Sequence, residues 1–439
     1  MSVCVTLTHF GFWAGTASSI MAALTAARAS LPALLLTLAL AHAAPPAPMA
    51  NPATSVLLTD AVASHGARCL DGTPQRYWLQ QPAAGSANAS KWVFDFMGGG
   101  WCEDLQSCAA RGYGFSCFIG SSRPECLARQ APGDGIPGVQ FNETMDFADI
   151  PSCLGSRWCG GLFNSDPTVN PLTHDWNKVL VSYCDGGSYA GDNATSTTVE
   201  FNGSDVELWF RGRANVQAIL DDLKANHGLA GASDVLLTGN SAGGLAVYWG
   251  ADRLAAALAP ARVVAVPDSG FFFTTAMNEG WRGALRWVVG QMDALGGLNQ
   301  RCVAALASDP ASCAFPEVAA PFISTPLFVM NSMHDPALDS ISAGIGQGNA
   351  TAVNAVGREL VDLVHATVMS RDGNAAFLTA CAQHCGQWSQ GPVPPPYFQD
   401  FNVSIDSCKY FSTAHLPHHQ PPLSNPSRLQ HRRAHRGRH

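Results

Sequence analysis

The sequence predicts an α/β fold with a mostly parallel central sheet flanked by helices. Short apolar runs typical of buried strands recur along the chain, at 91–97, 178–183, 234–238, 262–266 and 326–330. Segments with helical spacing separate some of these runs, at 205–226 and 245–254. Strands that alternate with helices favour parallel pairing, with helices on both faces of the sheet. The composition agrees, because 47% hydrophobic and only 13% charged residues, with 42 Gly and 28 Pro, are typical of a compact, loop-rich domain.

The first 43 residues are predicted to be a signal peptide that starts at Met1 or Met21. An apolar run at 31–40 precedes Ala41, His42 and Ala43, a small-x-small pattern typical of a cleavage site. The run is too short to cross about 30 Å of hydrocarbon as a helix, so we expect secretion without stable membrane insertion. Beyond it the sequence predicts a linker at 44–60, the α/β domain at 61–410 and a disordered, basic tail at 411–439.

Cysteine usage also favours an oxidising, extracellular location. Thirteen of the 14 cysteines follow the predicted signal peptide, and oxidising conditions would pair most of them. Thirteen is odd, so at least one thiol stays free or bonds outside the chain. The Cys- and Gly-rich region 102–170 is expected to be a disulfide-held insertion. Six sequons are compatible with a glycosylated surface: Asn88, Asn142, Asn193, Asn202, Asn349 and Asn402.

The charge of the chain bears on its partners. A formal net charge of −8 argues against a nucleic-acid partner, because phosphate binding needs a basic face. The exception is the arginine- and histidine-rich tail, which has few apolar residues to pack and is expected to be disordered rather than a surface-binding arm. We expect a monomer.

The strongest local motif is Gly239-Asn240-Ser241-Ala242-Gly243, which follows a predicted strand and precedes a predicted helix. A G-x-S-x-G nucleophile elbow requires this context, because only glycine avoids clashes on either side of so sharp a turn. The elbow exposes the serine hydroxyl above the sheet at a helix N-terminus. The sequence therefore predicts Ser241 as a nucleophile.

A serine hydroxyl needs a histidine base oriented by a carboxylate, and in this arrangement the acid and then the histidine follow the serine in the chain. Asp335, shortly after the predicted strand at 326–330, is the first candidate acid, and Asp339 and Asp268 are alternatives. His384, between Cys381 and Cys385, is the first candidate base. His334 and His365 are the alternatives for that role.

A glycine loop could stabilise the oxyanion of an acyl-transfer intermediate, which needs two or three N–H donors. Gly98, Gly99, Gly100 and Trp101 follow an early strand, and we expect donors from Gly99, Gly100, Trp101 and Ala242. An ordinary glycine turn is the alternative.

Cys381, His384 and Cys385 could also be part of a zinc site, but four-ligand sites usually come as two spaced pairs, so we expect neither metal nor cofactor.

Several longer motifs occur together in the chain. In order they are CLDG at 69–72, GGGWCE at 98–103, WNKV at 176–179, YCDGGSYAGD at 183–192, FRGR at 210–213, GNSAGGL at 239–245 and PDSGF at 267–271. This set resembles the pectin acetylesterase family, which also contains the Notum carboxylesterases. The resemblance runs from about residue 66 to 410 and implies an α/β-hydrolase-like fold with a Ser241, Asp335 and His384 triad. One departure is Asn240, where plant members have cysteine.

The resemblance implies a serine carboxylesterase that needs no cofactor. The motif at 183–192 is more similar to the plant branch, so the expected substrate is an acetylated cell-wall polysaccharide such as pectin. Removal of a fatty acyl group from a secreted protein, as in Notum, is the second expectation. A catalytically silent carbohydrate-binding protein is the alternative of another class, which the complete set of candidate residues disfavours.

Overall fold

The computed structural model describes residues 52–127, 144–145, 161–165, 167, 170–380, 382–385 and 410–412. All of them belong to one compact unit, which begins at Pro46. The predicted signal peptide lies outside the described residues, as do most of the predicted basic tail and the sequons at Asn142 and Asn402. No helix in the part of the chain so described is long and apolar enough to span a membrane.

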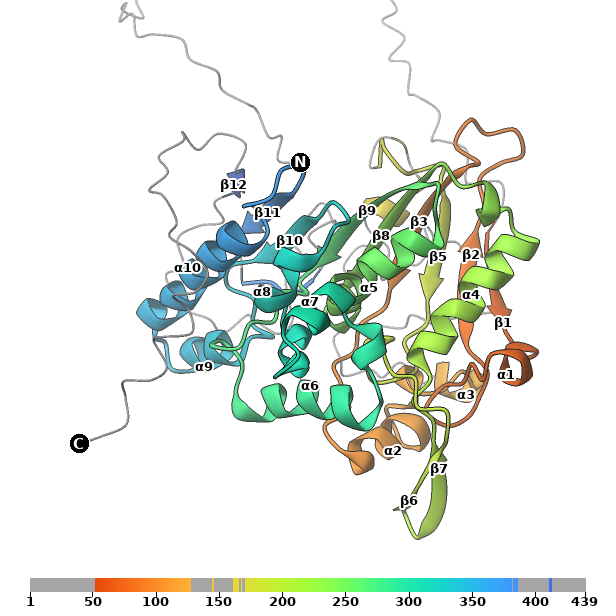
Figure 1. Cartoon of the computed structure of the whole chain (residues 1–439), viewed down its shortest axis with the longest axis horizontal. Helices are drawn as coiled ribbons and strands as arrows, with labels where there is room; N and C mark the ends of the chain where they lie inside the picture. The colour runs from red at the N-terminus through yellow and green to blue at the C-terminus, as the bar shows by residue number, and fades with distance from the viewer. Residues whose placement is uncertain are drawn as a thin grey trace, which may run out of the picture. The chain divides into compact units, whose positions relative to one another are not determined.

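The described residues form one large sheet and a separate hairpin (Figure 1). The sheet has the order β12-β11-β10-β9-β8-β3-β5-β2-β1-β4. The strands from β11 to β5 in this order pair in parallel, and antiparallel strands extend both sides of this block. The bounds in the sheet are β1 Ala53–Leu57, β2 Arg76–Gln80, β3 Lys91–Phe96, β4 Thr144–Met145, β5 Asn177–Val181, β8 Asp234–Asn240, β9 Arg262–Asp268, β10 Phe328–Ser332, β11 Ala375–Thr379 and β12 Tyr410–Ser412. The hairpin consists of β6 Thr197–Phe201 and β7 Ser204–Leu208.

The helices follow the strands in the alternation that the sequence predicts. Their bounds are α1 Ala61–Ser64, α2 Leu105–Tyr113, α3 Pro124–Leu127, α4 Gly212–Asn226, α5 Ala242–Ala257, α6 Glu279–Gln291, α7 Gln300–Ala305, α8 Pro316–Ala319, α9 Asp339–Gly346 and α10 Ala350–Thr367. Short 3-10 helices occupy Cys117–Ile119, Gly161–Phe163, Leu229–Gly231, Leu295–Gly297, Pro310–Ala314 and Ala320–Phe322. Every residue of β5 is buried, as in a strand covered on both faces, and α5 packs along β8 and β9. The mostly parallel sheet is therefore confirmed.

Three boundaries predicted from sequence are wrong. Residues 53–57, assigned to the linker, form β1, because they pair with β2 and extend the sheet. Residues 205–208, assigned to a helix, form part of β7, and the helix begins only at Gly212. Residues 411–412, assigned to the tail, lie in β12 beside β11.

Disulfides hold the loops around the sheet. Cys102–Cys108 and Cys117–Cys126 are local bridges in the region that was predicted to be a disulfide-held insertion. Cys302–Cys313 is also local, whereas Cys69–Cys184 joins segments 115 residues apart. Cys385 is a free, buried thiol, so one unpaired cysteine lies next to the candidate base His384.

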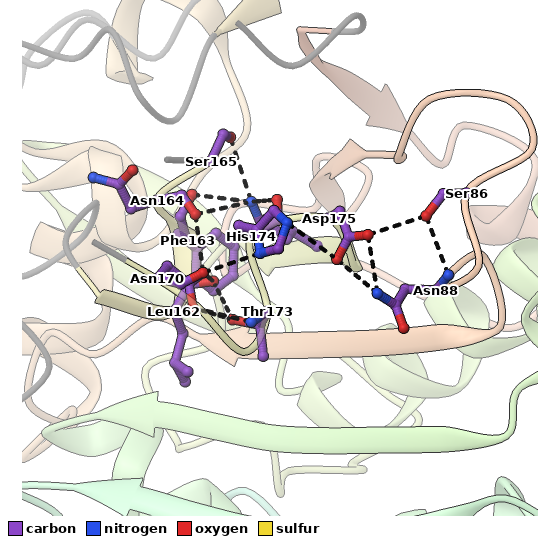
Figure 2. Close-up of polar contacts among 11 residues, drawn as sticks. Ser86, Asn88, Leu162, Phe163, Asn164, Ser165, Asn170, Thr173, His174 and Asp175 are labelled. Carbon is purple, nitrogen blue, oxygen red and sulfur yellow. Dashed lines mark hydrogen bonds and ion pairs between the residues drawn. The ribbon is translucent and has the colours of Figure 1, made fainter. Parts of the chain in front are cut away.

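A buried lysine fixes the segment that enters β5. Lys178 is completely buried, and its ammonium group donates to the carbonyl oxygen of His174 at 2.9 Å and of Phe163 at 3.3 Å. Figure 2 shows the polar contacts of this segment, including those of Asp175 with Ser86 and Asn88. These contacts anchor the chain before it pairs with β3, the strand that leads into the candidate oxyanion loop.

Candidate active site

Ser241 lies at the sharp turn between β8 and α5, as the elbow motif predicts. Its φ of 55° is in a region that non-glycine residues rarely adopt. A Cβ on Gly243 would stand 1.8 Å from the carbonyl oxygen of Phe96, and a Cβ on Gly239 would stand 2.6 Å from that of Gly243. Glycine is therefore required on both sides of Ser241, whose own side chain is half-buried.

Asp335 and His384 meet beyond the carboxyl ends of β10 and β11. These strands are parallel neighbours, so the loops that follow them lie at the same edge of the sheet. The Nδ1 atom of His384 lies 2.8 Å from Oδ1 and 3.0 Å from Oδ2 of Asp335. The Asp335 side chain is only 2% exposed, and Oδ1 also accepts the N–H of Ala337. The carboxylate is thus held in place to orient the imidazole.

The alternative acids and bases have other partners. Asp339 begins α9 and accepts the N–H of Asn278 at 2.9 Å. Asp268 is buried at the end of β9, where its carboxylate accepts the hydroxyl of Ser269. His334 is buried, with Nδ1 3.0 Å from the carbonyl oxygen of Ala380, and His365 lies near the end of α10. The Asp335 and His384 pair is therefore the arrangement that fits an acid and its base.

Backbone contacts bring the histidine loop toward the elbow. The N–H of Ser241 donates to the carbonyl oxygen of Asp268 at 3.0 Å, and the N–H of Cys385 donates to the hydroxyl of Ser269 at 2.8 Å. Asp268 and Ser269 thus connect the serine with the residue after His384. The contacts of the described residues include no hydrogen bond between Ser241 and His384, a bond that in hydrolases often tightens only when substrate binds.

The environment of His384 favours its protonated form. Burial lowers the pKa of the imidazole, but the negative charge of Asp335 and the contact with the Cys385 thiol outweigh this effect and raise the pKa to about 10. The same carboxylate would stabilise the imidazolium that forms when a histidine accepts a proton from serine.

Among the residues that the structure describes, no group of His, Cys, Asp and Glu is arranged to hold a metal ion.

The glycine loop lies directly against the elbow. A Cβ on Gly98 would stand 2.9 Å from Cβ of Ser241. Gly99 and Gly100 have φ values of 155° and 69°, a region that favours glycine. Within the described residues the N–H groups of Gly100 and Trp101 have no hydrogen-bond partner, and the N–H of Ala242 opens α5. The start of the glycine loop at Gly98 and the N–H of Ala242 therefore lie at the elbow, where the parallel strands β3 and β8 end.

Ser188 links the glycine loop with the elbow, a role that sequence reasoning missed. Its hydroxyl accepts the indole N–H of Trp101 at 2.8 Å and donates to the carbonyl oxygen of Ala242 at 2.7 Å. Ser188 belongs to the motif at 183–192, so the motif was a signal, but nothing in the sequence tells which contact it makes.

The ring of Trp101 packs edge-on against Phe272 and Trp281, and Phe272 also meets His384. These rings form an apolar wall beside the site.

Two carboxyl groups, one in β3 and one in the motif at 183–192, are buried. Burial and the charge of nearby Asp268 raise the pKa of Asp95, in β3, to about 7. Burial also raises the pKa of Asp185 to about 7, although the carboxylate accepts the N–H of Tyr189. Both groups therefore hold a proton at a higher pH than an exposed aspartate does.

Comparisons with known proteins agree with the geometry. The Pectinacetylesterase family model matches residues 49–160 and 154–393, which is more than half of the chain. Pectin acetylesterase 5 of Arabidopsis thaliana is 32% identical over 63% of this chain, a match that spans only 56% of that relative's own length. Pectin acetylesterase 11 of the same plant is 27% identical over 76% of this chain and 80% of its own length.

A second group of relatives carries a different name. The palmitoleoyl-protein carboxylesterase Notum of Homo sapiens is 25% identical over 72% of this chain and 58% of its own length. A solved structure of the Wnt deacylase Notum from Drosophila superposes with a TM-score of 0.59, at 22% identity, over 76% of this chain and 85% of that chain. This likeness confirms the predicted α/β-hydrolase-like fold.

Proposed function

Because the chain belongs to the pectinacetylesterase family, we propose that it is a secreted serine carboxylesterase that removes acetyl groups from a cell-wall polysaccharide such as pectin. The observation that carries the proposal is the Asp335 and His384 pair, held at 2.8 Å at the sheet edge where the Ser241 elbow and the glycine loop also lie. A binding protein has no need of such a set.

In the proposed reaction, His384 accepts the proton of the Ser241 hydroxyl while the serine oxygen attacks the ester carbonyl. The N–H groups of Gly99, Gly100, Trp101 and Ala242 are the proposed donors to the oxyanion. The ester C–O bond then breaks, and His384 returns the proton to the departing sugar hydroxyl. A water molecule, deprotonated by the same histidine, hydrolyses the acetyl-serine and releases acetate.

The second candidate is removal of a long acyl chain, the activity that the name of the Notum relatives states. The apolar wall of Trp101, Phe272 and Trp281 would suit such a chain. However, a ring atom of Trp281 lies 3.5 Å from the point where a Cβ on Gly100 would stand. A bulky ring so close to the oxyanion loop favours a small acyl group.

The test is hydrolysis of p-nitrophenyl acetate and p-nitrophenyl octanoate, followed by acetate release from O-acetylated pectin. We expect preference for the acetate ester, loss of activity in Ser241→Ala, and unchanged activity in Ser64→Ala, which removes an exposed serine hydroxyl in α1. Preference for the octanoate would support the second candidate. Inactivity of the wild-type protein on every ester would support the silent binding protein.

A further inference from the structure

The carbonyl groups of Gly99, Gly100 and Trp101 in the glycine loop each accept a short hydrogen bond from a side chain. The guanidinium group of Arg111, in α2, donates through Nη1 to the carbonyl oxygen of Gly99 at 2.7 Å and through Nη2 to that of Trp101 at 2.9 Å. The hydroxyl of Tyr183 donates to the carbonyl oxygen of Gly100 at 2.6 Å. The planar guanidinium group thus bridges Gly99 and Trp101, while the tyrosine hydroxyl binds Gly100 between them.

These bonds fix the N–H groups as well as the carbonyl groups. A peptide unit is planar, and its carbonyl group and the following N–H point in opposite directions. Arg111, by holding the carbonyl of Gly99, therefore directs the N–H of Gly100 away from the guanidinium group. Tyr183 does the same for the N–H of Trp101. Glycine at 99 and 100 would otherwise leave this backbone free to rotate, because it tolerates many conformations.

A disulfide and a helix cap hold the helix that carries Arg111. The Cys102–Cys108 disulfide ties the end of the glycine loop to α2, and Arg111 lies three residues after Cys108, on the same face of the helix. Asp104 caps the start of α2 by accepting the N–H of Ser107 at 2.7 Å. The helix, the disulfide and the arginine therefore form one unit with the loop.

The charge of Arg111 can also act on the site. None of the ion pairs among the described residues includes Arg111; its hydrogen bonds go to the loop carbonyl groups, while Glu103 and Asp185 act on its charge from farther away. Burial lowers the pKa of this guanidinium group, yet arginine keeps its charge in proteins. A positive charge behind the loop makes its N–H groups better donors to an oxyanion.

We propose that Arg111 is a positioning residue that preorganises the oxyanion hole by holding the carbonyl groups of Gly99 and Trp101. The inference rests on the proposed esterase function, since it assigns these N–H groups to the oxyanion. It predicts an effect on the transition state rather than on ground-state binding, because the oxyanion forms only as the serine attacks.

The test compares Arg111→Gln and Arg111→Lys with the wild type on p-nitrophenyl acetate. Loss of one oxyanion donor in a serine hydrolase lowers kcat by about 100-fold to 1,000-fold, so misaligned donors should lower kcat by roughly 10-fold to 100-fold with little change in KM. Lysine has one ammonium group and cannot bridge both carbonyl groups, so it should restore only part of the activity. The affinity for an alkyl boronic acid, which forms a tetrahedral adduct with serine, should fall in parallel with kcat/KM.

Arg123→Gln is the matched control, because Arg123 also donates to a carbonyl oxygen of the α2 region, that of Gly112, but does not contact the loop. It should leave kcat and boronic acid affinity unchanged. An active wild type whose folded Arg111→Gln variant retains kcat would overturn the role of Arg111 alone. If Arg111→Gln does not fold, a folded Arg111→Lys variant that retains the wild-type kcat would overturn the role instead. A wild type without esterase activity would overturn the proposed function and this inference with it.

Discussion

At the scale of single residues, the proposed catalysis depends on the hydrogen bond between the Asp335 carboxylate and the His384 imidazole. Burial lowers the pKa of His384, and Asp335 and Cys385 together raise it to about 10. Only the neutral imidazole can accept the proton of Ser241. The kcat/KM of the free enzyme should therefore rise with pH. The midpoint of this rise, the acid limb of the pH profile, should lie above the ordinary histidine pKa of about 6.5.

Asp335→Asn should move this limb to lower pH, because the neutral amide no longer favours the imidazolium. It should also lower kcat by about 10,000-fold, the effect of the same change in a serine protease triad. The measurement is kcat/KM for p-nitrophenyl acetate from pH 5 to 10. Asp339→Asn, at the start of α9, is the control and should keep both the acid limb and kcat. An unshifted limb in Asp335→Asn would assign the carboxylate another role.

The sequence predicts some site residues and misses others for a physical reason. Ser241 is recognisable because its elbow needs glycine at fixed positions within five residues. Asp335 and His384 are recognisable from chain order and the family resemblance, although they lie 49 residues apart. Arg111 and Ser188 are missed because their roles consist of contacts with backbone groups that no local pattern specifies.

At the scale of elements, the boundaries predicted from sequence are wrong for three strands, β1, β7 and β12. Residues 204–208 form β7 because Asn202 and Gly203, with φ values of 53° and 81°, make the tight turn that joins it to β6. An Asn-Gly pair with both φ angles positive is the preferred two-residue hairpin turn. The helical spacing of 205–226 hid this signal. Strand β1, which lies between β2 and β4, and the edge strand β12 were missed because only pairing with other strands identifies them.

The entry into β5 provides a test at this scale. Lys178→Ala should destabilise the protein by at least about 2 kcal/mol, because it leaves the buried carbonyl group of Phe163 and the half-buried one of His174 without this donor. Urea unfolding followed by tryptophan fluorescence measures the free energy of unfolding. Lys224→Ala, which removes a donor to the carbonyl oxygen of half-buried Ala257, is the control and should cost less, because no fully buried carbonyl group loses its donor there. Equal losses would contradict the anchoring role of Lys178.

At the scale of the whole molecule, buried carboxyl groups link stability to pH. Because the pKa values of Asp95 and Asp185 are raised to about 7 in the folded protein, the folded state binds more protons than the unfolded state between about pH 4 and 7. The free energy of unfolding should therefore fall as pH rises through this range. The raised pKa of His384 acts in the same direction at higher pH, so we expect greatest stability in mildly acidic solution.

Asp95→Asn removes one of these groups while keeping its shape. The variant should lose less thermal stability than the wild type between pH 5 and 8, as measured by the midpoint of thermal unfolding in a pH series. Asp60→Asn, which changes an exposed aspartate next to α1, is the control and should follow the wild type. A wild-type midpoint that rises from pH 5 to 8 would contradict this linkage, because groups with lowered pKa, such as Asp252, change stability only below about pH 4.

The central claim is that Ser241 is a nucleophile activated by His384. The most direct measurement is labelling of the intact protein with a fluorophosphonate, followed by mass spectrometry of its peptides. The account predicts one adduct per chain, on Ser241, with labelling absent in Ser241→Ala and much slower in His384→Ala. An adduct on another residue, or no adduct on folded protein, would contradict it.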